Sequence, residues 1–170
     1  MTHTMITALQ DDVEEHIVAA AEGYEFLLKQ NPPVEAYLNL ACLYWRSTDF
    51  GFASYYRLTD TFYLKAGEKC YEVLERAAEA FPECSEVIFW QRYFAWSERD
   101  VAFSDEECLR IAQMPSSSLV PFFRLYSPPE CKYEKEALAL LAEIQALPTI
   151  KNRYIIPILE KKLGSRKLVQ

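Results

Sequence analysis

Glycine is scarce in this sequence of 170 residues, which contains only four, at Gly23, Gly51, Gly67 and Gly164. All-β folds use glycine at their many tight turns, so this scarcity favours helices. No alternation of apolar and polar residues with a period of two lasts long enough to predict a strand. The sequence therefore predicts an all-α fold.

Close pairs of cysteines and histidines are also lacking. The five cysteines include no Cys-x-x-Cys pair, and His3 and His16 lie far from all of them in sequence. Metal sites normally gather their ligands at short spacings, so we expect no metal and no cofactor. We expect reduced, mostly buried thiols, which fit a cytoplasmic protein. These thiols are at Cys42, Cys70, Cys84, Cys108 and Cys131.

Long apolar runs and catalytic motifs are missing as well. The N-terminus lacks the basic start and apolar run of a signal peptide, and no window approaches the roughly 20 apolar residues of a membrane span. There is no glycine-rich phosphate loop, Gly-x-Ser-x-Gly elbow or His-Glu-x-x-His motif. A cluster of carboxylates at Asp100, Asp105, Glu106 and Glu107 lacks the spacing and turn glycine of a calcium loop, and we interpret it as helix capping. We expect neither an enzyme nor a membrane protein.

Charge is unevenly distributed along the chain. The net charge is −7, but residues 149–170 hold six basic side chains against Glu160 alone, which leaves 1–148 at −12. An acidic body repels the phosphate backbone, so we expect no nucleic-acid partner. The basic end is expected to fold back on the acidic body or to be solvated.

Apolar residues at helical spacing run through the whole chain. They make up 51% of it, enough for the core of a single domain over 1–170, with a repeat-like core at 11–99, helices at 104–163 and a basic tail at 164–170. A Ser-x-x-Glu capping box at Ser104 and Glu107 marks one helix start. The segment 50–81 is interpreted as one long helix, with a kink near Gly67 as the alternative. The predicted helices are 13–28, 34–47, 50–81, 85–98, 104–113, 119–126, 133–147 and 150–163.

Two stretches of the chain match each other when shifted by 50 residues. In both, a helix is followed by a proline turn and a second helix. One helix pair cannot bury its apolar face alone, so such pairs are expected to stack. The matched positions are Ala20, Tyr24, Leu27, Leu28 and Pro32 with Cys70, Leu74, Ala77, Ala78 and Pro82, and Tyr37, Leu40 and Tyr44 with Val87, Trp90 and Phe94.

At these residues, over 20–46 and 70–96, the sequence resembles tetratricopeptide-repeat (TPR) proteins. Residues 20–32 are close to the pattern of the second TPR helix, small-x-x-x-aromatic-x-x-Ala-Leu-x-x-x-Pro. Residues 37–44 match Trp-x-x-Leu-Gly/Ala-x-x-Tyr of the first helix. The chain departs from the family at Gln91, where a small residue is expected, and in its spacing, which is 34 residues in TPRs. The resemblance implies seven to eight helices in antiparallel pairs, stacked as a short right-handed array.

In TPR proteins the first helix of each pair lines a concave groove. The resemblance therefore implies a partner-binding surface in which large aromatic and arginine side chains, the usual anchors of interfaces, are prominent. Its positions are Glu35, Leu38, Cys42, Trp45 and Arg46 in the first block and Ser85, Ile88, Arg92, Ala95 and Trp96 in the second.

The leading functional hypothesis is a non-catalytic protein-binding module, such as an adaptor, a chaperone-like protein or an immunity protein. It would hold another protein or a peptide in the helical groove. The alternative is a helical bundle that binds a small molecule or lipid in an aromatic pocket. A homodimer stays open, because a second copy could cover an exposed aromatic stripe.

Overall fold

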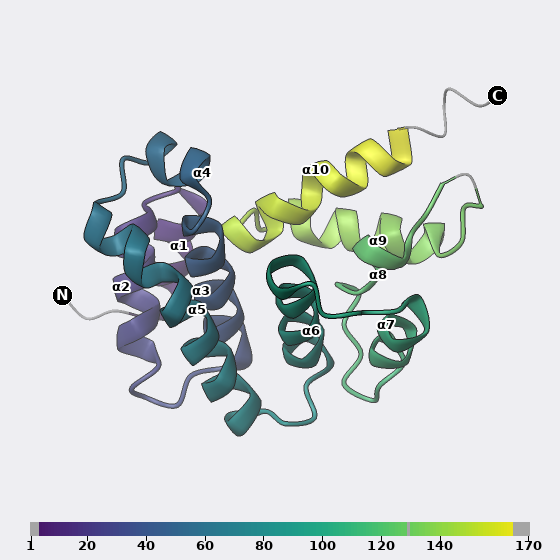
Figure 1. The fold of residues 1–170 in the computed structure, drawn as a ribbon, viewed down its shortest axis with the longest axis horizontal. Helices are drawn as coiled ribbons and strands as arrows, with labels where there is room; N and C mark the ends of the chain where they lie inside the picture. The colour runs from purple at the N-terminus through teal and green to yellow at the C-terminus, as the bar shows by residue number, and fades with distance from the viewer. Residues whose placement is uncertain (1–3, 129, 165–170) are drawn as a thin grey trace. The chain divides into compact units, whose positions relative to one another are not determined.

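The computed structural model describes residues 4–128 and 130–164, which form ten helices and no strand (Figure 1). An isolated antiparallel bridge joins Ser127 and Lys132. The all-α prediction is confirmed. The predicted basic tail at 164–170 lies outside the described residues beyond Gly164, as does His3.

The chain divides into two compact units. One comprises Met1–Ala80 with Pro148–Lys151, and the other comprises Phe81–Leu147 with Asn152–Gln170. The first holds helices α1 to α5 and the start of α10, and the second holds α6 to α9 and the rest of α10. The prediction of a single domain stays a prediction beside this division.

The first unit is built around α3 (Val34–Ser47), which packs against α2 (Ile17–Leu27), α4 (Phe50–Tyr55) and α5 (Asp60–Ala80). Helix α1 (Met5–Val13) packs against α2. Every residue of α3 from Ala36 to Tyr44 is buried. A helix that is buried on all sides is a central element of its core, because its apolar residues cover more than one stripe.

Most of the positions that carry the internal repeat are buried. In the first unit these include Tyr24, Leu40, Tyr44 and Leu74, each at most 2% exposed. Fully burying a side chain of this size contributes roughly 1.5–3 kcal/mol. The repeat pattern therefore marks core residues of this unit, while the TPR resemblance itself stays a prediction.

A polar network joins four segments of the first unit. The buried Asp12 carboxylate accepts hydrogen bonds from the Tyr24 hydroxyl at 2.9 Å and from the backbone N–H of Ile150 at 2.6 Å. The Tyr24 hydroxyl in turn accepts from the Asn39 side-chain amide at 3.2 Å. Because buried polar groups are costly when unpaired, this network favours one register of α1, α2, α3 and the segment at Ile150.

The second unit has a core of aromatic rings. Its helices are α6 (Ser85–Arg99), α7 (Asp105–Ala112), α8 (Phe122–Leu125), α9 (Glu134–Gln145) and most of α10 (Ile150–Gly164). Phe89, Trp90 and Tyr93 of α6 each lie within 6.0 Å, between ring centres, of Phe123 of α8. Phe89 also contacts the ring of Phe103, 5.9 Å away. These rings join α6 to the segment that contains α8.

Two predicted helix boundaries were wrong. The predicted helix 13–28 is in fact the end of α1 and all of α2, and Asp12 is a buried residue of α1 rather than a helix start. The predicted helix 50–81 is broken between Tyr56 and Thr59 into α4 and α5, whereas α5 runs through Gly67 without a break. The structure therefore has more helices than the seven or eight predicted.

Both missed breaks have the same backbone geometry. After α1, the N–H groups of His16 and Glu15 bond to the carbonyls of Asp11 and Asp12, with Glu15 at φ 64°. After α4, Leu58 and Arg57 bond in the same way to Ala53 and Ser54, with Arg57 at φ 53°. This is the Schellman motif, which normally places glycine at the left-handed position. Without that glycine, the sequence carried no visible stop signal.

The remaining boundaries are close to those predicted, except at the start of α8. Helix α6 extends one residue beyond the predicted 85–98, and α10 one residue beyond 150–163. The Ser104 side chain caps α7, accepting from the N–H of Glu107 at 3.1 Å. Helix α8 is shorter than the predicted 119–126. These ends agree because serine and proline signals lie at or near them.

Candidate functional site

The predicted partner-binding residues of the first unit all belong to α3. Glu35 is exposed, Trp45 and Arg46 are half-buried, and Leu38 and Cys42 are buried. The Arg46 guanidinium lies over the ring of Phe52, 5.2 Å from its centre. Leu38 and Cys42 are therefore packed side chains, and the accessible part of this set is the two ends of α3.

The predicted residues of the second unit belong to α6. Ile88, Arg92 and Ala95 are half-buried, Ser85 is buried, and Trp96 is 42% exposed. Arg92 is engaged within the unit, since its guanidinium forms a two-point ion pair with Glu107 at 2.6 and 3.2 Å. It also donates to the carbonyl of Ala102 at 2.7 Å. Trp96 is the aromatic residue of this set, and part of its ring is accessible to solvent.

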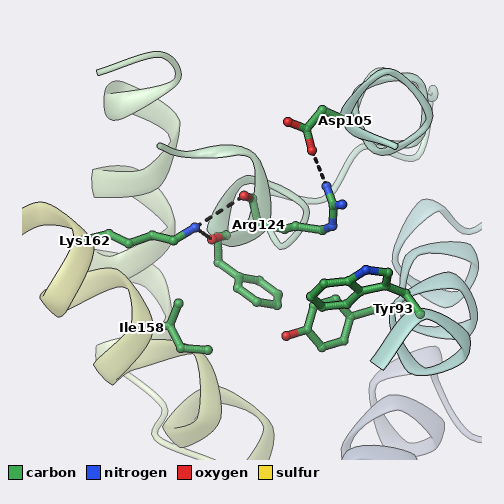
Figure 2. Close-up of a pocket in the computed structure, with 7 residues that line it drawn as sticks. Tyr93, Asp105, Arg124, Ile158 and Lys162 are labelled. Carbon is green, nitrogen blue, oxygen red and sulfur yellow. Dashed lines mark hydrogen bonds and ion pairs between the residues drawn. The ribbon is translucent and has the colours of Figure 1, made fainter. Parts of the chain in front are cut away.

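Trp96 is one of the residues that line a cleft of about 350 Å³ within the second unit. Figure 2 shows this cleft. Four helices contribute to it: α6, α7, α8 and α10. The side chains combine an aromatic and aliphatic surface with two cations and one carboxylate. The lining residues are Tyr93, Trp96, Asp105, Phe123, Arg124, Ile158 and Lys162. We regard this cleft as the candidate functional site.

Arg124 is the most constrained charge in the cleft. Its guanidinium carbon lies 4.6 Å from the ring centre of Phe103 and 5.4 Å from that of Trp96. One terminal nitrogen donates to the Asp105 carboxylate at 2.5 Å, and the other donates to the Phe103 carbonyl. The Arg124 side chain is 15% exposed, whereas that of Asp105 is 78% exposed. The cation is thus held in place, while its carboxylate partner lies at the surface.

Lys162 supplies the second positive charge from α10. Its ammonium donates to the carbonyls of Phe123 and Tyr126 at 2.8 Å each and to that of Arg124 at 3.3 Å, as Figure 2 shows in part. These carbonyls lie at the C-terminal end of α8, where a cation is favoured. Burial, and secondly the nearby Arg124 guanidinium, lower the pKa of Lys162, and Asp105 partly offsets this. With Arg124 and Lys162 against Asp105 alone, the side chains that line the cleft carry more positive than negative charge.

The floor of the cleft is aromatic. The Tyr93 ring lies 5.2 Å from that of Phe123 and 5.4 Å from that of Trp96, between centres. The Tyr93 and Tyr154 hydroxyls share a hydrogen bond of 2.6 Å. Burial, and then the Tyr154 hydroxyl, raise the pKa of Tyr93 well above its ordinary value. Tyr93 therefore stays neutral at physiological pH and serves as a packing and hydrogen-bonding group.

The titratable side chains that line the cleft are Tyr93, Asp105, Arg124 and Lys162. The lining residues include no cysteine, histidine or serine. Cys108 of α7 is buried, and burial raises its pKa to about 11, so it is a thiol rather than a reactive thiolate near pH 7. Across the described residues, no three His, Cys, Asp or Glu side chains gather as a metal site would require.

No family model, curated protein or solved structure matches this chain. None of the described helices is both long and apolar enough to cross a membrane.

Sequence reasoning found Trp96 but missed the two cations that line the same cleft. Arg124 lies in the segment interpreted as a short apolar helix, and Lys162 lies in the basic end. A lone arginine among Val120, Phe122, Phe123 and Leu125 is a usable signal, because a charge in an apolar segment needs a partner. Lys162 carries no such signal. Only the fold brings it to α8, where it meets backbone carbonyls rather than the carboxylates expected.

Proposed function

We propose that this chain is a non-catalytic protein-binding module that holds a segment of another protein in the cleft of its second unit. The observation that carries the proposal is the contact between Trp96 and Arg124. The Trp96 ring is partly exposed and lies against the guanidinium of Arg124, which is held in place. Tryptophan, tyrosine and arginine are the residues that most often dominate binding energy at interfaces. Trp96 was also among the positions that the TPR resemblance implied.

Preorganisation supports the same proposal. Arg124 is held by two rings, a carbonyl and a carboxylate, so a partner would not have to order a flexible side chain. Ordering a side chain with many rotamers costs about 0.5–1.5 kcal/mol on binding. A cleft that has already met this cost binds more tightly for the same contacts.

A TPR-like arrangement of the repeat-bearing helices is part of the proposal. It is supported in the first unit, where α3 packs against both α2 and α5 and where repeat positions such as Tyr24, Leu40 and Leu74 are buried. An experimental structure in which α3 and α5 do not pair as antiparallel neighbours would contradict it.

Site-specific photocrosslinking tests the binding function. A benzophenone side chain replaces Trp96 in one variant and Leu138 in another, since Leu138 of α9 is 50% exposed and does not line the cleft. We expect saturable crosslinking to a defined protein only from position 96. The purified partner should then bind Trp96→Ala at least about tenfold more weakly than wild type, the scale of a loss above 1.4 kcal/mol at an interface anchor.

Two outcomes would contradict the proposal. The first is equal labelling from both positions; the second is a purified partner that binds Trp96→Ala as tightly as wild type. A small molecule retained in native mass spectrometry of the wild type, and lost from Trp96→Ala, would instead support the small-molecule alternative.

A further inference from the structure

The charges of the cleft are not balanced by its own residues. The cleft is lined by two basic side chains, Arg124 and Lys162, and by one carboxylate, that of Asp105. Lys162 bonds to neutral carbonyls, and it forms no ion pair with a carboxylate in the part of the chain that the structure describes. An additional anion would therefore be stabilised here.

The existing partner of Arg124 can be displaced at low cost. Asp105 is 78% exposed, so its carboxylate is already largely solvated and can leave Arg124 for water. Asp105 is also the first residue of α7, so after release its carboxylate stays favourably placed at the positive end of that helix. Arg124 would keep its contacts with Phe103 and Trp96.

An apolar surface adjoins the exchangeable ion pair. Trp96, Tyr93 and Ile158 line the same cleft as Arg124. A ligand that offers only an anion would leave this surface exposed to water, whereas a ligand that also covers it gains the free energy of burying apolar surface. The best complement is a chain that presents an anion and an apolar side chain a few ångströms apart.

We propose that the cleft recognises an acidic peptide segment, in which an Asp or Glu carboxylate takes the place of Asp105 on Arg124 and a neighbouring apolar side chain covers Trp96. Asp105 then acts as an internal competitor that occupies the cation until a partner arrives. This inference rests on the proposed protein-binding function and specifies the chemistry of the bound segment. The incoming carboxylate accepts from the terminal nitrogen that now donates to Asp105, because the other terminal nitrogen is held by the Phe103 carbonyl.

The test begins with an unbiased probe. A display library of random octapeptides is selected on the full-length wild-type protein, and one enriched peptide is made with a fluorescent label. We expect the selected peptides to be enriched in Asp or Glu next to an apolar residue. The affinity is then measured for that peptide and for its counterpart with the acid replaced by its amide.

Two variants test the two members of the ion pair separately. Arg124→Gln should weaken binding of the acidic peptide by about thirtyfold, because one member of a charge pair is removed. Asp105→Asn should strengthen it by up to about fivefold, because the competitor is gone. The amide peptide should respond to neither. Arg110→Gln, an exposed change on α7 away from the cleft, is the matched control and should change nothing.

The increase in affinity expected of Asp105→Asn cannot arise from a folding defect. The inference therefore stays testable even if Arg124→Gln does not fold. Selected peptides without acidic enrichment, which bind wild type and Asp105→Asn equally but fail to bind Trp96→Ala, would overturn this inference and leave the proposed function standing. A selection that yields no peptide sensitive to Trp96→Ala would count against both.

Discussion

Single residues in this protein combine structural and functional roles. Arg124 illustrates this, since the same guanidinium holds the segment at Phe103 through its carbonyl and ring and also presents charge to the cleft. Arg92 shows the opposite case. It was a predicted groove residue, but its two-point pair with Glu107 commits it to joining α6 and α7. Residue type alone does not distinguish these roles, because both arginines lie near aromatic rings.

The buried hydroxyl of Tyr24 provides a prediction at this scale. Tyr24→Phe removes the donor to Asp12 and the acceptor of Asn39 while keeping the ring. We expect the free energy of unfolding to fall by about 1–3 kcal/mol, the cost of leaving buried polar groups unsatisfied. Urea denaturation measures it. Tyr55→Phe, at a residue that is 77% exposed, is the control, and an equal effect of the two changes would contradict the role of the network.

At the scale of the elements, several helices of this chain are followed by a non-glycine residue with a positive φ. No described glycine has a positive φ, and Glu15, Asn31, Arg57 and Asp100 occupy the left-handed region instead. A side chain with a Cβ pays roughly 1–2 kcal/mol there. The helices therefore end where hydrogen bonding and tertiary contacts require it, at some cost in local strain.

The left-handed residue after α4 allows this cost to be measured. Arg57 is exposed and has φ 53°, so Arg57→Gly should relieve strain and raise the free energy of unfolding by about 1 kcal/mol. Lys65→Gly, within α5, should lower it by about 1 kcal/mol, since glycine is unfavourable inside a helix. Thermal and urea unfolding would show the two changes in opposite directions. A loss of stability in both variants would mean that Arg57 is not strained.

The start of α7 gives a second prediction for an element. Ser104→Ala removes the side-chain oxygen that accepts from the N–H of Glu107, and it should cost about 1 kcal/mol. Ser104→Asp keeps an acceptor and should retain most of the stability. Ser117→Ala, in an exposed loop, should have no effect. Because α7 carries Asp105, hydrogen exchange of its first amides should rise in Ser104→Ala, and unchanged exchange would show that the cap is unimportant.

At the scale of the whole molecule, stability should depend on pH through a cluster in the first unit. Glu25 accepts hydrogen bonds from Lys69 and Tyr44. Burial opposes ionisation of Glu25, but these bonds and the charge of Lys69 outweigh it and hold its pKa below the ordinary value of 4.5. A carboxyl whose pKa is lowered on folding stabilises the folded state above its unfolded pKa, and this contribution is lost as the pH falls through the folded pKa.

The free energy of unfolding should therefore decrease on acidification below about pH 4.5, and Glu25→Gln should make this decrease smaller. The group is partly exposed, so the effect should be modest and should weaken with added salt. Urea titrations at a series of pH values measure it, with Glu79→Gln as an exposed control on α5. Identical pH profiles for wild type and Glu25→Gln would show that the pair does not stabilise the fold.

Much of the architecture could be read from residue patterns. Helical spacing predicted the regions of α3, α6, α9 and α10 with ends within about two residues, because amphipathic periodicity and proline or serine signals are local properties. The repeat predicted positions such as Tyr24 and Leu74 that are now seen in the core. The breaks after α1 and α4 could not be read, since Glu15 and Arg57 carry no stop signal.

The site was predictable only in part. Trp96 was identified from its position on α6, but Leu38 and Cys42 of the same predicted surface are buried, because α3 is enclosed over its whole middle. Arg124 and Lys162 are 38 positions apart in sequence, and no pattern pairs them. A cleft depends on which helix ends meet, and this is a property of packing rather than of spacing.

By itself, then, the sequence determined that this chain is helical and which faces are apolar, because both follow from interactions between residues three or four positions apart. Only the tertiary structure decided that Arg124 lies over the rings of Phe103 and Trp96 and forms an ion pair with the exposed Asp105. It also decided that Lys162 donates to a backbone carbonyl at the end of α8. These contacts join residues distant in the chain, and their energies exist only once the helices have packed.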